Sequence, residues 1–271
     1  MIQVETHATL DQAASALQSD SIFLAGGTLV MRALNYGEQN FQRIVRCTDP
    51  KLTEIARQSD RVRIGAGVTM SQIIASSDVA FLHPVARQVG GPAVRNMATV
   101  GGNLFAGHPY GDFCVALLAL DAQVQKSDGS EQDLEGFLQQ RASFSGVVAS
   151  VSVSRPSSPS DFRWLKVSRT KPKGVSVLSI AAWLPNGGTN NCRIAFGAMG
   201  DQPQRARGVE QALQGGSLTE SGVQAALAAI ANDLTPPDDA LASSWYRKEV
   251  APVHLKRLLL GSGAAAAGGL A

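Results

Sequence analysis

Two glycine-rich segments of this chain carry the backbone best suited to binding an anion. In the first, Leu24 to Leu29, an apolar run ends in Gly26-Gly27 and a helix is expected to begin at Thr28. Glycines let backbone N–H groups approach a ligand closely, and a helix N-terminus carries partial positive charge. The segment is therefore a candidate phosphate loop. A tight turn capped by Thr28 is the alternative, since the G-x-G-x-x-G spacing and the Walker A lysine are both absent.

The second segment, residues 99–112, contains four glycines and ends on Asp112. A loop so rich in glycine has a large ordering cost, which is reasonable if a ligand must lie against its backbone. We expect Asp112 to cap the helix of residues 113–120, with ligand contact as an additional role. That helix is apolar on every side and should be central in its domain. Two such segments indicate a ligand with two phosphates, each segment supplying amides to one end of a pyrophosphate.

Composition limits the possible functions. The chain has 271 residues with 24 Lys+Arg and 22 Asp+Glu, which gives a formal net charge of +2. The basic residues are scattered, which argues against nucleic-acid or acidic-membrane binding driven by charge. The longest apolar run, Val115 to Leu120, is far too short to span a bilayer, and no secretory signal is visible, so a cytoplasmic location is expected. Charged residues make up 17%, against a usual ~25%, which hints that other subunits cover part of the surface.

The cysteines and histidines are too few and too scattered for a metal centre. Cys47, Cys114 and Cys192 lie far apart, and no C-x-x-C is present. An ordinary iron–sulfur cluster needs four thiolates, so this chain cannot hold one alone. The four histidines form no H-E-x-x-H or other paired-ligand pattern. No metal site is therefore expected in this chain.

The remaining pattern predicts two domains joined near the Ser/Pro-rich stretch 155–160. Before it, short apolar strands alternate with helices, as in an α/β domain. After it, three antiparallel strands are followed by helices, with Pro252 expected to start, kink or break the last helix. The Gly/Ala-rich tail after Gly261 is expected to be frayed. The strands are predicted at residues 162–168, 175–184 and 191–199, and the helices near residues 204–214, 219–232 and 242–260.

Several motifs, in order along the chain, resemble those of one known family. Ala25-Gly26-Gly27-Thr28 together with Arg95-Asn96-x-x-Thr99-Val100-Gly101-Gly102-Asn103 looks like the FAD-binding subunit of molybdenum hydroxylases. That is the family of the xanthine dehydrogenase flavin domain and the carbon monoxide dehydrogenase medium subunit. The resemblance covers about residues 20–260. Its further motifs are Pro109-x-x-Asp112 with Ala116 to Ala122, Lys166-Val167-Ser168-Arg169, Phe196 to Gly200 and Trp245-Tyr246-Arg247.

The resemblance implies an α+β fold in two parts. A two-subdomain FAD-binding domain of the vanillyl-alcohol-oxidase/p-cresol-methylhydroxylase type is expected over residues 1–158, with subdomains at about 1–55 and 56–158. A C-terminal α+β domain with a three-stranded antiparallel sheet and helices is expected over residues 159–271. FAD would lie extended between the two small subdomains, and the C-terminal domain would close over it.

The resemblance also implies a role for individual residues. Asp112 matches a position that contacts the cofactor, Val148 one that flanks the flavin or adenine, and Lys166 a basic residue near the isoalloxazine. A cation there would stabilise the reduced flavin anion, although a surface lysine on a strand is the alternative. His108 and Tyr110 are bulky for this loop and would either cover the flavin or fill surface. The expected cofactor contacts are Leu24, Ala25, Gly26, Gly27, Thr28, Leu29, Val30, Met31, Thr99, Val100, Gly101, Gly102, Asn103, Asp112, Val148 and Lys166.

The function implied is that of an FAD-binding electron-transfer subunit in a heterotrimer, with a dimer of heterotrimers expected. A large partner subunit would hold the molybdenum–pterin cofactor, and a small one would hold two [2Fe–2S] clusters. Electrons would pass from the clusters through FAD to NAD⁺, a quinone, a carrier protein or O₂, and no side chain here need act on the organic substrate. Two alternatives stay open: a self-sufficient flavin oxidoreductase on the same fold, and a non-enzymatic nucleotide-binding or assembly protein.

Overall fold

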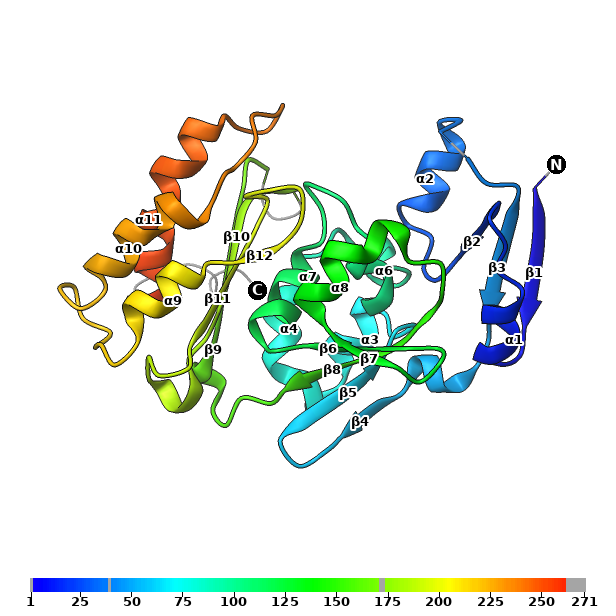
Figure 1. The fold of residues 1–271 in the computed structure, drawn as a ribbon, viewed down its shortest axis with the longest axis horizontal. Coiled ribbons are helices and arrows are strands. Elements are labelled where there is room, and N and C mark those ends of the chain that lie inside the picture. The colour runs from blue at the N-terminus through cyan, green and yellow to red at the C-terminus, as the bar shows by residue number, and fades with distance from the viewer. Residues whose placement is uncertain (1, 39, 171–173, 262–271) are drawn as a thin grey trace. The chain divides into compact units, whose positions relative to one another are not determined.

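Figure 1 shows the computed structural model of the chain, which describes residues 2–38, 40–170 and 174–261. The chain divides into two compact units. Unit 1 is formed by Met1–Ala106 and Ala122–Ser154, and unit 2 by Gly107–Asp121 and Arg155–Ala271. The expected domain boundaries stay a prediction, but this division shows that the apolar helix near residue 115 belongs with the second half of the chain.

Unit 1 contains a small parallel sheet with strand order β1-β3-β2. The central strand β3 buries Ile44 and Val45, and its neighbours pair with it in parallel. Thr9 caps the first helix by accepting a hydrogen bond from the amide of Gln12. The elements are β1 (Gln3–His7), α1 (Leu10–Ser15), β2 (Ser21–Phe23), α2 (Val30–Asn35) and β3 (Arg43–Cys47).

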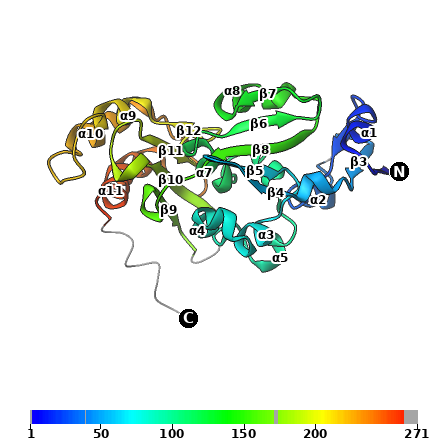
Figure 2. The same ribbon diagram turned by 90° about the horizontal axis from the view of Figure 1, so that it is seen from below.

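Unit 1 also contains a five-stranded antiparallel sheet of order β4-β5-β8-β6-β7. Its central strands mix fully buried with partly buried positions, and Val62, Ile64, Val151 and Val153 lie in the core. Figure 2 shows these strands side by side and the short helices α3, α4 and α5 grouped together. The elements are β4 (Ile55–Arg57), β5 (Arg61–Gly65), α3 (Met70–Ala75), α4 (His83–Ala86), α5 (Pro92–Arg95), α6 (Val100–Leu104), β6 (Gln123–Lys126), β7 (Glu131–Asp133), α8 (Leu134–Gln140) and β8 (Val148–Ser154).

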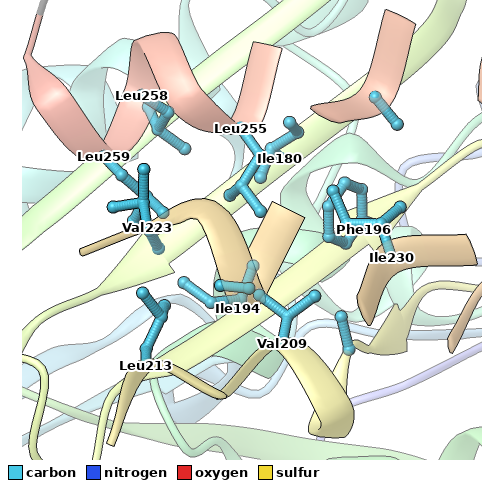
Figure 3. Packing of buried hydrophobic residues seen from close by; sticks show 14 of the residues in the cluster. Ile180, Ile194, Phe196, Val209, Leu213, Val223, Ile230, Leu255, Leu258 and Leu259 are labelled. Atoms are coloured by element: carbon cyan, nitrogen blue, oxygen red, sulfur yellow. The ribbon is translucent and has the colours of Figure 1, made fainter. Parts of the chain in front are cut away.

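Unit 2 is built on an antiparallel sheet of order β12-β11-β10-β9. The three predicted strands are confirmed, and a two-residue fourth strand, β12, adds to the expected three. Helices α9, α10 and α11 cover one face of this sheet, where Ile180, Ile194 and Phe196 meet Leu255 and Ile230 in a continuous apolar core (Figure 3). The elements are β9 (Phe162–Ser168), β10 (Ser176–Trp183), β11 (Arg193–Gly197), β12 (Gln204–Arg205), α9 (Arg207–Leu213), α10 (Gln224–Asp233) and α11 (Ser244–Leu260).

The other face of the same sheet packs against α7 (Asp112–Ala119). All eight residues of α7 are buried, as its uniformly apolar sequence predicted. The strands make room for the helix with small residues. A Cβ on Gly197 would overlap the hydroxyl of Ser179 and lie 2.5 Å from Cγ2 of Val115. Close helix packing therefore requires glycine at this position.

Two local expectations for helices were wrong. Asp112 is not the cap of α7, because Gly111 takes that position in the left-handed conformation (φ 92°) and Asp112 becomes the first helical residue. Its carboxylate is directed instead to partners in the sheet of unit 2. Pro252 neither starts nor breaks the last helix: α11 runs through it from Ser244 to Leu260, because the core packing of Ala251 and Leu255 outweighs the one lost hydrogen bond. The expected frayed tail lies outside the described residues.

Candidate functional site

The first glycine segment presents a run of backbone donors that the protein does not use. The amide of Leu24 still pairs with the carbonyl of Val45, at 2.8 Å, and the amides of Met31 and Ala33 begin the hydrogen bonding of α2. Between them, the amides of residues 25–29 have no acceptor within the part of the chain that the structure describes. Gly27 has a positive φ of 70°, which turns the chain here. Five successive donors are thus available to water or to an anion.

Within unit 1, the first glycine segment packs against the backbone directly before the second segment. A Cβ on Gly26 would overlap the carbonyl oxygen of Met97 and lie 3.3 Å from Cα of Ala98. Only glycine therefore permits this approach of one backbone to the other. The sequence predicted two separate loops that serve one ligand; the structure places the start of the second loop close to the first, and the shared ligand stays a prediction.

Residues 100–103, at the start of the second segment, use their amides within the protein itself. Thr99 caps α6, with its hydroxyl accepting from the amide of Gly102 at 3.0 Å and its carbonyl from the amide of Asn103 at 3.1 Å. The amides of Val100 and Gly101 donate to the carbonyls of Val68 and Ala66. In this geometry the segment offers a ligand no free amides of residues 100–103, unlike the expectation from its glycines.

Gly101 and Gly102, the two central glycines of this segment, are glycine for different structural reasons. A Cβ on Gly101 would lie 2.8 Å from the Cβ of Ala66, so packing explains that glycine. Gly102 is exposed, and a Cβ there would meet only the hydroxyl of Thr99, at 3.0 Å. Asn103 is buried, and its side-chain amide donates to the carbonyl of Thr99 at 2.9 Å. Of these two glycines, Gly102 is therefore the one where a ligand can approach the backbone.

Asp112 and Lys166 form a buried ion pair in unit 2. The Lys166 ammonium lies 2.7 Å from Oδ2 of Asp112, and the Ser176 hydroxyl donates to Oδ1 at 2.6 Å. The two charged side chains are only 6% and 11% exposed, which rules out a surface lysine. The structure thus pairs two of the predicted cofactor contacts with each other. Val148, at the start of β8 in unit 1, is 4% exposed and its side chain belongs to the core.

The partner of His108 could not be predicted from the sequence. Nε2 of His108 lies 2.6 Å from Oδ2 of Asp239, and both residues belong to unit 2. Burial alone would raise the pKa of Asp239, but hydrogen bonds from His108, the amide of Ala242 and Arg247 hold it well below its usual range. Asp239 follows two prolines in an irregular loop far along the chain, and no sequence spacing links it to residue 108.

No three side chains of His, Cys, Asp or Glu come together as a possible metal site in the described ranges 2–38, 40–170 and 174–261. In the same ranges, no helix has the length and apolar character needed to cross a bilayer.

Family models match both halves of the chain. Residues 1–152 match the FAD binding domain in molybdopterin dehydrogenase, and residues 163–262 match the CO dehydrogenase flavoprotein C-terminal domain. The chain therefore belongs to the FAD-binding family of the molybdopterin dehydrogenases, which are oxidoreductases. The resemblance seen in the glycine segments is confirmed, and so is the α+β fold class.

Named relatives agree with this membership. The chain is 28% identical over 255 residues to the nicotinate dehydrogenase FAD-subunit of Eubacterium barkeri, covering 88% of this chain and 86% of that one. It is 27% identical over 263 residues to the xanthine dehydrogenase FAD-binding subunit of Escherichia coli O157:H7, covering 91% and 90%. A chain of carbon monoxide dehydrogenase from Hydrogenophaga pseudoflava shares the fold with a TM-score of 0.86 and 22% identity, over 97% of both chains.

Proposed function

We propose that this chain is the FAD-binding electron-transfer subunit of a heterotrimeric molybdenum hydroxylase. Electrons would arrive from two [2Fe–2S] clusters of a small partner subunit and leave to an external acceptor. A large partner subunit would hold the molybdenum–pterin cofactor, and two heterotrimers would associate in the cytoplasm. Relatives that are named as FAD subunits of nicotinate and xanthine dehydrogenases support this assignment.

One observation carries the proposal: the five unused amides of residues 25–29, in a loop whose Gly26 packs against the Met97–Ala98 backbone shortly before the exposed Gly102. The diphosphate of FAD is a dianion that needs several N–H donors and close approach to backbone, and these residues fit it. The family match to an FAD domain over residues 1–152 identifies the nucleotide. When bound, FAD supplies the redox chemistry, and the protein sets its position and potential.

The residues of the proposed site divide by what they offer. Amides of Ala25 to Leu29 bind the diphosphate, and Gly102 leaves the space that it occupies. Leu24, Val30 and Met31 hold the ends of the first loop. The backbone around Gly102 is held by Thr99, Val100, Gly101 and Asn103, through the Thr99 cap and the two amide bonds to the carbonyls of Val68 and Ala66. Val148 remains a proposed contact beside the flavin or adenine, through its backbone.

Lys166 is proposed to tune the flavin, together with its partner Asp112. The ammonium is already balanced by the carboxylate at 2.7 Å, so the pair is neutral as a whole. Lys166→Ala removes the positive charge and leaves the carboxylate, which disfavours a reduced flavin anion. We expect the variant to keep FAD and to lower its reduction potential. An unchanged potential in spectroelectrochemistry would show that Lys166 is remote from the flavin.

The subunit assignment is tested by purifying the full chain with its natural partners. We expect flavin absorption near ~450 nm in this chain, with iron and molybdenum in the chains that copurify. Flavin in a solitary chain without iron or molybdenum would support the self-sufficient flavin oxidoreductase instead. A stable chain that takes up no FAD would support the assembly protein.

The site is tested by Gly102→Val. The folded protein has room for a side chain here apart from the Thr99 hydroxyl, so the variant should fold and yet lose FAD through collision with the diphosphate. Gly188→Val is the matched control, because a Cβ there meets only the carbonyl of Pro185 at 3.6 Å. FAD content is measured by absorbance after release. Normal flavin content in folded Gly102→Val would contradict the site.

A further inference from the structure

A fully buried arginine begins a chain of hydrogen bonds in unit 2. Arg247 lies in α11 and has no solvent exposure. Its Nε donates to the carbonyl of Val177 at 2.9 Å, and its Nη1 donates to those of Pro237 and Ala242 at 2.6 and 2.9 Å. Its Nη2 donates to Oδ2 of Asp239 at 2.8 Å. A buried guanidinium is tolerated only when its donors are satisfied in this way, and the result is a rigid anchor for Asp239.

Asp239 is the centre of the chain of bonds. Oδ1 accepts from the amides of Leu241 and Ala242, at 2.8 and 3.0 Å, and Oδ2 accepts from Arg247 and from His108. A carboxylate in receipt of four hydrogen bonds is ionised and fixed in orientation. Arg169 adds a bond to the carbonyl of Ala240, so the loop that carries Asp239 is held from β10, α11 and the end of β9.

His108 forms the other end of the hydrogen-bond chain that begins at Arg247. Because ionised Asp239 can only accept, Nε2 of His108 must carry the hydrogen at 2.6 Å, in either charge state of the ring. Nδ1, the other ring nitrogen, is buried without a hydrogen-bond partner in the described part of the chain. His108 stands in the 107–111 loop, where Tyr110 donates its amide to the carbonyl of Gly107 and Cys114 donates to that of Gly111. The loop leads directly into Asp112 and α7.

We propose that His108 is a positioning residue, through which Arg247 and Asp239 fix the 107–111 loop and set Asp112 for FAD binding. This inference rests on the proposed function. Both ends of the loop are then held: one by the bond of His108 to Asp239, the other by Asp112 with Lys166 and Ser176. A loop with two glycines in five residues has a high conformational entropy when free. A fixed anchor therefore lowers the entropy cost of ordering this loop when a ligand binds.

The test compares variants that keep or remove the hydrogen bond to Asp239 in the full-length chain. His108→Gln retains an N–H donor at a similar distance from the backbone, whereas His108→Leu retains the bulk without the donor. FAD binding to the FAD-depleted chain is measured by flavin fluorescence, and exchange of the Tyr110 and Cys114 amides is measured by hydrogen–deuterium mass spectrometry. His254→Leu is the control, because this histidine lies on α11 and is not part of the hydrogen-bond chain from Arg247 through Asp239 to His108.

We expect His108→Leu to raise the Kd for FAD about tenfold and to speed exchange at both amides, with His108→Gln within about threefold of the wild type. The double variant His108→Leu with Asp239→Ala should bind FAD as Asp239→Ala alone does, because Asp239→Ala already removes the acceptor for His108. Additive losses, or wild-type affinity and exchange in His108→Leu, would overturn the proposal. If the wild-type chain binds no FAD, the proposed function fails. In that case, amide exchange still tests the hydrogen-bond chain by itself: unchanged exchange in His108→Leu overturns the anchoring of the 107–111 loop, and faster exchange supports it.

Discussion

The two glycine segments of unit 1 look alike in sequence and differ in what their backbones do. Residues 25–29 leave five successive amides without protein acceptors, whereas the amides of residues 100–103 all have protein partners. Gly26 and Gly101 are glycines because another backbone or side chain lies where a Cβ would be. Gly102 has no such neighbour beyond its own cap. A glycine required by packing and one that leaves room for a ligand can thus be separated by what surrounds them.

This difference changes the physical account of the site. The sequence alone indicated that each segment supplies amides to one end of a pyrophosphate. In the structure the amides of residues 25–29 have no protein acceptor, whereas those of residues 100–103 are occupied and Gly102 stays open. Under the proposed function, a bound ligand would accept hydrogen bonds from the amides of residues 25–29, and the missing side chain of Gly102 would leave space for it. The contact of Gly26 with Met97 is what holds these two contributions together.

The largest effect is expected where the two segments touch. Gly26→Ala would place a Cβ against the Met97 carbonyl, which is backbone and cannot rotate away, and should destabilise the fold by about 3 kcal/mol. Chemical denaturation measures the loss. Gly37→Ala is the control, since its φ of 73° is strained for alanine but no atom lies within 4 Å, and its cost should be about 1 kcal/mol. Equal losses in the two variants would show that the segments separate easily.

A smaller effect should distinguish the neighbouring glycines of α6. Gly101→Ala meets the Cβ of Ala66 at 2.8 Å and should cost about 2 kcal/mol, also by denaturation. Gly102→Ala is its matched control. It gains helix propensity, loses little to the Thr99 hydroxyl, and should change stability by less than about 0.5 kcal/mol. Similar costs at the two positions would remove the distinction between a packed and an open glycine.

The smallest effect is expected at Asp239, which holds the 107–111 loop of the second segment through its bond to His108. Burial opposes ionisation of Asp239, but its hydrogen bonds lower the pKa below the ordinary value of about 3.9. Its stabilisation is therefore complete above that value and is lost as the pH falls toward the folded-state pKa. Asp239→Asn should destabilise by about 1.5 kcal/mol at pH 7 and by progressively less below pH ~4. A difference between the two proteins that does not change between pH 7 and pH 3 would contradict this.

The sequence was sufficient for the elements whose pattern is strong. The run from Phe162 to Ser168 and the two strands after it alternate or are fully apolar, and their antiparallel sheet was predicted with boundaries within two residues. Strand β1 was missed because Gln3–His7 lies mostly exposed and shows no apolar periodicity. The capping box of Thr69 and Gln72 was recognisable because both partners are local.

What the sequence could not supply is long-range pairing. Asp112 looked like a helix cap because a cap needs only local spacing, whereas its real partners, Lys166 and Ser176, come from strands more than fifty residues away. The bond from His108 to Asp239 is of the same kind. Which amides of a glycine loop are occupied also depends on distant carbonyls, such as those of Ala66 and Val68. Residue types identified the candidates, and only the fold assigned their partners.

The placement of α7 has a consequence for how the chain can be divided. This helix precedes β6 in the chain, yet it packs on the sheet of unit 2, so the backbone passes from one unit to the other three times. A fragment of residues 1–158 would carry α7 with its apolar surface uncovered, and a fragment of residues 159–271 would lack the helix that covers Gly197 and Ser179. Neither half is self-contained. Expressed separately, the two pieces should aggregate alone and recombine when mixed, which makes this subunit a natural candidate for fragment complementation.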